Sequence, residues 1–120
     1  MESLFIYELR IYRPHQGKLE ALLERFRNHS LRLLAKHGMV TVGFWTHVSA
    51  ENGDEVIYVL QFEDEAHQKK GWIEFFADPE WQRVHADSEI HGPLVEKVTS
   101  RLMQKADFFA NDPRPQQVQI

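Results

Sequence analysis

The stretch Val56-Ile57-Tyr58-Val59-Leu60-Gln61-Phe62 is almost continuously apolar. A run of this kind predicts a strand that is covered on both faces, because a half-exposed strand alternates apolar and polar residues. Asn52-Gly53 precedes the run and favours a hairpin turn, and Asp64 follows it in a position to cap a helix. The chain is therefore expected to enter this strand from a hairpin and to leave it into a helix.

The flanking segments complete a β-α-β-β-α-β order. A helix is predicted from Lys18 to His37, because leucines recur there at helical spacing and Gly38 can end it in a left-handed conformation. Its charged residues, Arg25 among them, are expected to face water. The other predicted elements are strands at Leu4 to Arg13, Val40 to Ser49 and Val95 to Met103, a helix at Glu65 to Phe76, and a short helix begun by Asp78-Pro79.

This order predicts an α+β, ferredoxin-like sheet whose helices lie on one face, because both β-α-β crossovers should be right-handed. The opposite face then has no cover from its own chain, although strand residues such as Leu9 and Val59 would make it apolar. A patch of that size favours a second copy packed sheet to sheet about a two-fold axis. We therefore expect a homodimer, with residues 1–104 as the domain. Residues 105–120 would be a tail whose Phe108-Phe109 pair docks on its own chain or on the mate.

The composition of the chain limits the classes of partner and site that it can have. The chain has 120 residues, a net charge of −4, a pI near 5.9 and no cysteine. An acidic chain of this kind does not favour nucleic acid as a partner, and the lack of cysteine excludes disulfides and thiolate sites. No apolar stretch approaches the roughly 20 residues that span a bilayer. The expectation is a cytoplasmic protein with no membrane partner.

Several short motifs, taken in order, resemble the NIPSNAP family. They extend over residues 5 to 103 and are Tyr7-Glu8-Leu9-Arg10-Ile11-Tyr12 with Gly17-Lys18, Lys36-His37-Gly38, Gly43-Phe44-Trp45, Phe62-Glu63-Asp64, and Ala77-Asp78-Pro79-Glu80-Trp81. The resemblance implies a dimeric α+β barrel and no single agreed activity. Barrels of this fold include cofactor-free monooxygenases, lactone isomerases and haem-handling proteins, which is an analogy of fold alone. The chain departs from the family at Phe62, where tyrosine is commoner, and at Gln68-Lys69-Lys70, where an arginine is expected.

Glu8, Arg10 and Tyr12 fall on one strand face, because alternate residues point the same way. Together they could bind an acidic or polar group: Arg10 could bind a carboxylate through two parallel hydrogen bonds, Tyr12 could form a wall of the site, and a desolvated Glu8 could act as a base. The alternative is a structural Glu8–Arg10 pair at the dimer interface.

The histidines and tryptophans supply the other candidates. His29, on the apolar side of the first helix, and His47 are candidate acid or base groups. Trp45 shares a strand face with His47 and is a candidate wall of a ligand pocket there. Core packing is the alternative for His29, and an ordinary sheet face for Trp45 and His47. Further candidates to line a cavity under the later helices are Trp72, Phe76, Trp81 and His85, with core or surface positions as the alternative. For His37 the favoured interpretation is an interaction with the last carbonyls of its helix.

The leading hypothesis is a homodimer that binds or modifies a small organic molecule in a cavity between sheet and helices. If it is an enzyme, it would resemble a cofactor-independent monooxygenase or isomerase. Neither a metal nor another cofactor is expected, because the histidines lack a metal-ligand spacing and the glycines form no phosphate loop. The rival hypothesis is a non-catalytic interaction module whose buried polar residues serve dimerisation.

Overall fold

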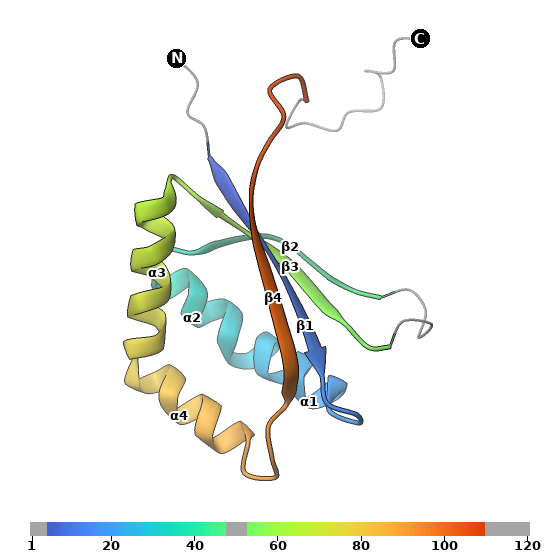
Figure 1. Ribbon diagram of the computed structural model, residues 1–120. Coiled ribbons are helices and arrows are strands. Elements are labelled where there is room, and N and C mark those ends of the chain that lie inside the picture. The colour runs from blue at the N-terminus through green and yellow to red at the C-terminus, as the bar shows by residue number, and fades with distance from the viewer. Residues whose placement is uncertain (1–4, 48–52, 110–120) are drawn as a thin grey trace.

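A computed structural model describes residues 5–47 and 53–109 (Figure 1). The strands are β1 (Ile6–Pro14), β2 (Val40–Thr46), β3 (Val56–Phe62) and β4 (Val95–Gln104). The helices are α1 (Leu19–Arg25), a π-helical turn (Phe26–Ser30), α2 (Leu31–Lys36), α3 (Glu65–Ala77) and α4 (Pro79–Ser88). This order confirms the predicted β-α-β-β-α-β arrangement. The predicted hairpin residue Asn52 lies outside the described residues.

The sheet has the strand order β2-β3-β1-β4, with every neighbouring pair antiparallel. The register places Glu8 opposite Leu60 and Arg10 opposite Tyr58. Directly opposed residues in an antiparallel pair project from the same face. The polar residues of β1 therefore share a face with the buried side chains of β3.

The helices gather on one side of this sheet, as the crossover rule predicts (Figure 1). The core lies between them and the sheet, and it includes Leu22, Phe26, Leu33, Leu34, Met39, Val56, Tyr58, Leu60, Phe62, Phe75 and Leu94. Along β3 the burial alternates: the residues facing the helices are buried, whereas Ile57, Val59 and Gln61 are half-buried. The prediction that β3 is covered on both faces is thus wrong for the single chain, because the helices shield one side alone. We call the other side, with Tyr7, Leu9, Ile11, Val40, Trp45, Ile57 and Val59, the open face.

Helix ends follow the predicted signals. Gly38 takes the left-handed conformation, with a φ of 77°, directly after α2. The side chain of Asp64 accepts a hydrogen bond from the His67 backbone N–H at 2.8 Å and so caps α3. Asp78 caps α4 in the same way, through the Glu80 N–H at 2.8 Å. In the part of the chain that the structure describes, no helix is long and apolar enough to cross a membrane.

The helix predicted over Lys18 to His37 is confirmed, but its middle turn is a π-helix. A π-turn contains more residues than an α-turn, so it shifts the side chains that follow it around the axis. Phe26 and Ser30, at its two ends, are both buried against the sheet. Arg25 is buried as well, which corrects the prediction that it faces water. It pairs with Glu89, at 3.1 Å, which directly follows the last residue of α4.

Candidate functional site

The polar face of β1 points toward the helices. Glu8, which is 2% exposed, accepts hydrogen bonds from the Trp72 indole at 2.8 Å, the Gln68 amide at 3.1 Å and Arg10 Nη1 at 2.9 Å. Both carboxylate oxygens are therefore occupied by donors of this chain, two of them from α3. This geometry makes Glu8 the acceptor that fixes α3 and Arg10 to the sheet. Because the Glu8–Arg10 pair lies beneath α3, it is not part of the open face, and the carboxylate is satisfied by donors of its own chain.

Arg10 is held on three sides. Its Nη1 binds Glu8, its Nη2 donates to the Tyr12 hydroxyl at 3.0 Å, and its guanidinium lies 4.2 Å from the centre of the Trp72 ring. Burial lowers the pKa of this guanidinium, but the oxygens of Tyr12, Tyr58 and Glu8 outweigh burial and raise the pKa above its ordinary value. Arg10 is consequently a fixed cation that Glu8 already neutralises. An incoming carboxylate would have to compete with Glu8 for it.

Tyr58 extends this network into the core. Its hydroxyl lies 2.9 Å from the Tyr12 hydroxyl, and either can be the donor. Burial, together with the neighbouring Tyr12, raises the pKa of Tyr58 well above its ordinary value. Tyr58 therefore stays protonated at any physiological pH and can act as a hydrogen-bond donor.

Beside this network an open groove of about 550 Å³ runs between β4 and the α3–α4 corner. We call it the outer groove; its lining is Arg10, Tyr12, Arg25, Phe76, Trp81, Gln82, His85, Glu89, Pro93, Val95, Glu96, Lys97 and Val98. Its walls include aromatic and aliphatic side chains, and its two arginines are paired with carboxylates. Arg25 pairs with Glu89, and Glu89 also lies 3.3 Å from His85. A groove with this balance suits an uncharged ligand with an apolar body.

A smaller cavity, about 40 Å³, continues from the outer groove toward the core. This inner cavity is lined by Tyr12, Arg25, Phe26, Ser30, Leu34, Tyr58, Trp72, Phe75, Phe76 and Trp81, four of which also line the outer groove. The predicted cavity between sheet and helices is thus present but small, because stacked rings fill most of the space. Phe26, Phe44 and Tyr58 have ring centres 5.1 to 5.7 Å apart. Most of the free volume lies at the mouth.

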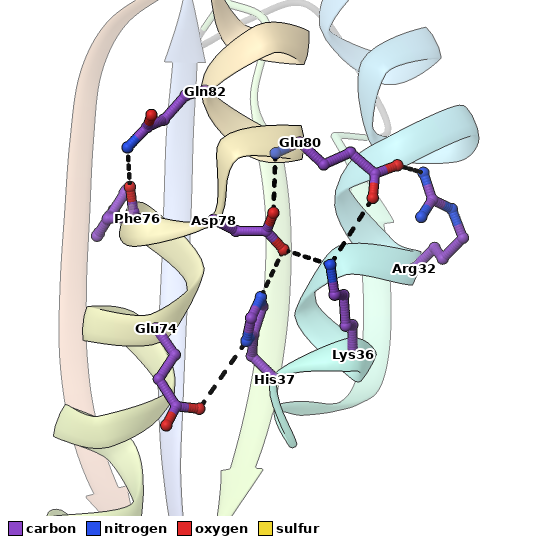
Figure 2. Close-up of polar contacts among 8 residues, drawn as sticks. All are labelled: Arg32, Lys36, His37, Glu74, Phe76, Asp78, Glu80 and Gln82. Carbon is purple, nitrogen blue, oxygen red and sulfur yellow. Dashed lines mark hydrogen bonds and ion pairs between the residues drawn. The ribbon is translucent and has the colours of Figure 1, made fainter.

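The α3–α4 corner that forms one wall is fixed by a polar cluster (Figure 2). Asp78, at the corner, accepts hydrogen bonds from Lys36 at 2.8 Å and His37 at 2.7 Å, both at the end of α2. Lys36 foremost, then His37 and the Glu80 N–H, hold the pKa of Asp78 far below its ordinary value. The favoured interpretation of His37 as a partner of its own helix carbonyls is therefore wrong. Its imidazole joins α2 to the corner that positions Phe76 and Trp81.

The predicted site residues fall into two groups. Arg10, Tyr12, Phe76, Trp81 and His85 all line the outer groove, and Trp72 stacks on Phe76 with ring centres 5.4 Å apart. The structure thus brings together every residue of the predicted ligand-binding set except Trp45.

The three predicted catalytic residues are not brought together. His29 lines a separate groove of about 530 Å³ between the first helix and α4, where its Nδ1 is buried without a partner. His47 lies at the end of β2, where its Nδ1 accepts from the Glu55 N–H at 3.2 Å. Glu8 is under α3. Trp45 lies on the open face, with its ring over Gly43, where no side chain occupies the space. Among the described residues, no group of three acidic or histidine side chains could hold a metal ion.

Several residues of the site were not singled out from the sequence. Tyr58 carries one of the two polar side chains of an otherwise apolar strand, and Gln68 stands at a departure from the family pattern, so each has a weak signal. Ser30 and Arg25 owe their places to the π-turn and to a partner 64 residues away, and neither leaves a local signature.

A family model described as NIPSNAP matches residues 7–110. The chain belongs to the NIPSNAP family. Solved structures of NIPSNAP proteins share its fold. A family protein of unknown function from Agrobacterium tumefaciens is 20% identical with a TM-score of 0.78, over 91% of this chain and 95% of that one. An uncharacterized NIPSNAP domain protein from Burkholderia xenovorans is 24% identical with a TM-score of 0.75, over 88% and 99%.

The NIPSNAP fold also resembles that of a putative antibiotic biosynthesis monooxygenase from Chloroflexus aurantiacus. That protein is 11% identical, with a TM-score of 0.52 over 85% of this chain and 93% of the other. Among curated proteins, none matches the sequence. These comparisons establish family and fold, and they leave the activity to be argued from the site.

Proposed function

We propose that this NIPSNAP protein is a cytoplasmic homodimer that binds a small, uncharged organic molecule with an aromatic body in the outer groove. The main support is the convergence of five predicted ligand residues on that groove. Phe76 and Trp81 offer ring faces on one side, and Val95 and Val98 offer aliphatic surface on the other. Pockets for small molecules combine such apolar walls with a few polar groups that fix orientation.

The polar groups at the floor have spare donors. A guanidinium has five N–H groups, and Arg10 uses one toward Glu8 and one toward Tyr12. Because Glu8, Tyr12 and Trp72 fix the guanidinium, it is preorganised to donate to a ligand oxygen without losing side-chain entropy. The same pairing with Glu8 removes the net charge that would draw in an anion.

A ligand titration followed by NMR tests this proposal, because the chain has three tryptophans in informative places. Trp72 and Trp81 border the site, whereas Trp45 lies on the open face and serves as an internal control. With acetophenone as the probe, the indole N–H signals of Trp72 and Trp81 should shift and saturate, and that of Trp45 should not. A shift of Trp45 alone, or of none of the three, would refute the proposed groove.

A matched pair of variants on α3 sharpens the test. Phe76 and Ile73 are both exposed apolar residues of this helix, at 54% and 69%, but Phe76 alone lines the outer groove. We expect Phe76→Ala to weaken acetophenone binding about fivefold, because a ring contact of this size is worth on the order of 1 kcal/mol. Ile73→Ala should bind as the unaltered protein does. Equal effects of the two would place the ligand elsewhere.

The dimer rests on the open face. Leu9, Ile11 and Val59 stay half-buried in the single chain, and Trp45 is 52% exposed, so a continuous apolar surface faces water. A second copy packed on it would bury this surface. In the described part of the tail, Phe108 and Phe109 are exposed, so their rings do not pack on their own chain, and docking on the mate is part of the same proposal.

Sedimentation at micromolar concentration tests the dimer. The unaltered chain should sediment as a dimer of about 28 kDa, twice the 14.2 kDa chain. Leu9→Lys, on the open face, should yield a folded monomer, because a buried unpaired charge opposes association. Ile73→Lys, on the far side of α3, should remain dimeric. An unaltered chain that sediments as a monomer would contradict the proposed assembly.

A further inference from the structure

The inner cavity contains hydrogen-bond donors that the fold does not use. Tyr12 and Tyr58 have one hydroxyl proton each, and they share a single hydrogen bond of 2.9 Å. Tyr12 also accepts from Arg10, so that contact consumes none of the two protons. Whichever phenol donates to the other, one hydroxyl proton is left without an acceptor among the described residues. Both phenols line the inner cavity, so this proton is available there.

Ser30 adds a second donor at the same place. It is 3% exposed and lines the inner cavity, yet its hydroxyl forms no hydrogen bond with any residue that the structure describes. The π-turn explains its position: it brings Ser30 inward at the end of the turn that begins with buried Phe26. π-turns of this kind are often found at functional sites.

The shape and polarity of the inner cavity define what fits these donors. Its volume of about 40 Å³ admits a head group of only a few atoms, while the outer groove has room for a ring system. Apart from the two phenols, Ser30 and the paired Arg25, the lining is aromatic or aliphatic. Burying a carboxylate there would cost far more than burying a neutral carbonyl, because Arg25, the cation of this lining, is already paired with Glu89.

From this arrangement we infer that the inner cavity binds the neutral carbonyl oxygen of an aryl ketone, aldehyde or amide. Ser30 and the spare phenol proton donate to its two lone pairs. A carbonyl oxygen can accept two hydrogen bonds, so it matches the two donors. The inference rests on the proposed function, since the aryl body would lie in the outer groove between Phe76 and Trp81. It makes Ser30, Tyr12 and Tyr58 the residues that determine specificity.

Three probes of one shape test the selectivity: acetophenone, benzoate and ethylbenzene. We expect acetophenone to bind at least tenfold more tightly than the other two, as measured by titration of the Trp72 and Trp81 indole signals. If none of the three binds, the proposed function itself fails. If all three bind with similar affinity, the outer groove is a ligand site but the inner cavity does not select a carbonyl. The inference about the inner cavity is then overturned, while the proposed function stands.

Variants that lack the Tyr12 or Tyr58 hydroxyl should give a binding result that a purely structural role of these phenols would not produce. Tyr12→Phe and Tyr58→Phe each remove one hydroxyl proton and the one shared hydrogen bond, so each still leaves one free phenol proton. Each single change should therefore weaken acetophenone binding by less than about 1.5-fold, whereas the double change should weaken it about tenfold, the net worth of a lost hydrogen bond and well above the roughly twofold product of the two single effects. Simple additivity of the two single changes would contradict the shared-proton scheme.

Ser30→Ala supplies an independent variant if the double change fails to fold. It should weaken acetophenone binding three- to tenfold, a loss of the order expected for one hydrogen bond, and leave ethylbenzene binding unchanged. Ser100→Ala, an exposed serine of β4 that lines neither the groove nor the cavity, is the matched control. If Ser30→Ala weakens the binding of acetophenone and of ethylbenzene to the same extent, the effect is one of packing, and the role of this hydroxyl is overturned.

Discussion

Substituting Glu8 by glutamine removes one charge from the centre of the buried network and keeps its shape. The new side chain retains a carbonyl oxygen for Trp72 and Gln68, but its amide presents a donor to Arg10, which is itself a donor. Removing one partner of a buried ion pair costs roughly 3–5 kcal/mol, because the other charge is left uncompensated. Arg10 keeps its contacts with Tyr12 and Trp72 and is 14% exposed, which places the expected loss at the low end, about 3 kcal/mol.

Thermal unfolding followed by circular dichroism measures this loss at one fixed protein concentration. For a domain of this size each kcal/mol corresponds to roughly 4 °C, so the midpoint should fall by about 12 °C. Glu63→Gln, an exposed residue just after β3, is the control and should change stability by less than about 0.5 kcal/mol. In the double variant Glu8→Gln, Arg10→Met, no unpaired cation remains beside residue 8, so the loss should be smaller than the sum of the two single losses. A loss below about 1 kcal/mol for Glu8→Gln would refute the assignment of Glu8 as the anchor of α3.

Three further changes test the elements around the site. Asp64→Ala removes the cap of α3 and should cost about 1 kcal/mol in chemical denaturation, whereas Glu65→Ala, one residue on, should cost little; equal losses would contradict the capping role. Asp78 has a lowered pKa in the folded state, so the stability it adds is present above about pH 4 and is lost as the pH falls further. The unfolding midpoint of Asp78→Asn should therefore fall less between pH 5 and pH 2 than that of the unaltered protein. An equal fall in both would contradict the role of this carboxylate. Gly43→Ala places a methyl group against the indole of Trp45 and should cost about 1 kcal/mol while shifting the Trp45 indole signal; an unmoved signal would contradict the contact.

The sequence predicts the fold well because each element has a local signal. Helical spacing, the caps Asp64 and Asp78, and Gly38 mark where the helices begin and end. The alternation of β1 correctly places Glu8, Arg10 and Tyr12 on one face. The aromatic side of the outer groove is also predictable, because Asp78-Pro79 indicates the turn between α3 and α4, and Phe76 and Trp81 flank that turn.

The parts that sequence reasoning misses depend on long-range contacts. Arg25 resembles a solvated helix residue until its partner Glu89, 64 positions later, is brought beside it by α4. His37 likewise binds Asp78 across 41 residues rather than its own helix end. The π-turn has no recognised sequence pattern here, so the inward position of Ser30 could not be read. His29, which the spacing places on the apolar side of the helix, lines the groove between the first helix and α4.

A crystal structure of the protein soaked in acetophenone tests the binding site most directly. The ring should lie between Phe76 and Trp81, with its carbonyl oxygen within hydrogen-bonding reach of Ser30 and of one of the two phenols, Tyr12 or Tyr58. Acetophenone bound on the open face or beside His29, with no density between Phe76 and Trp81, would contradict the site on which the proposed function depends.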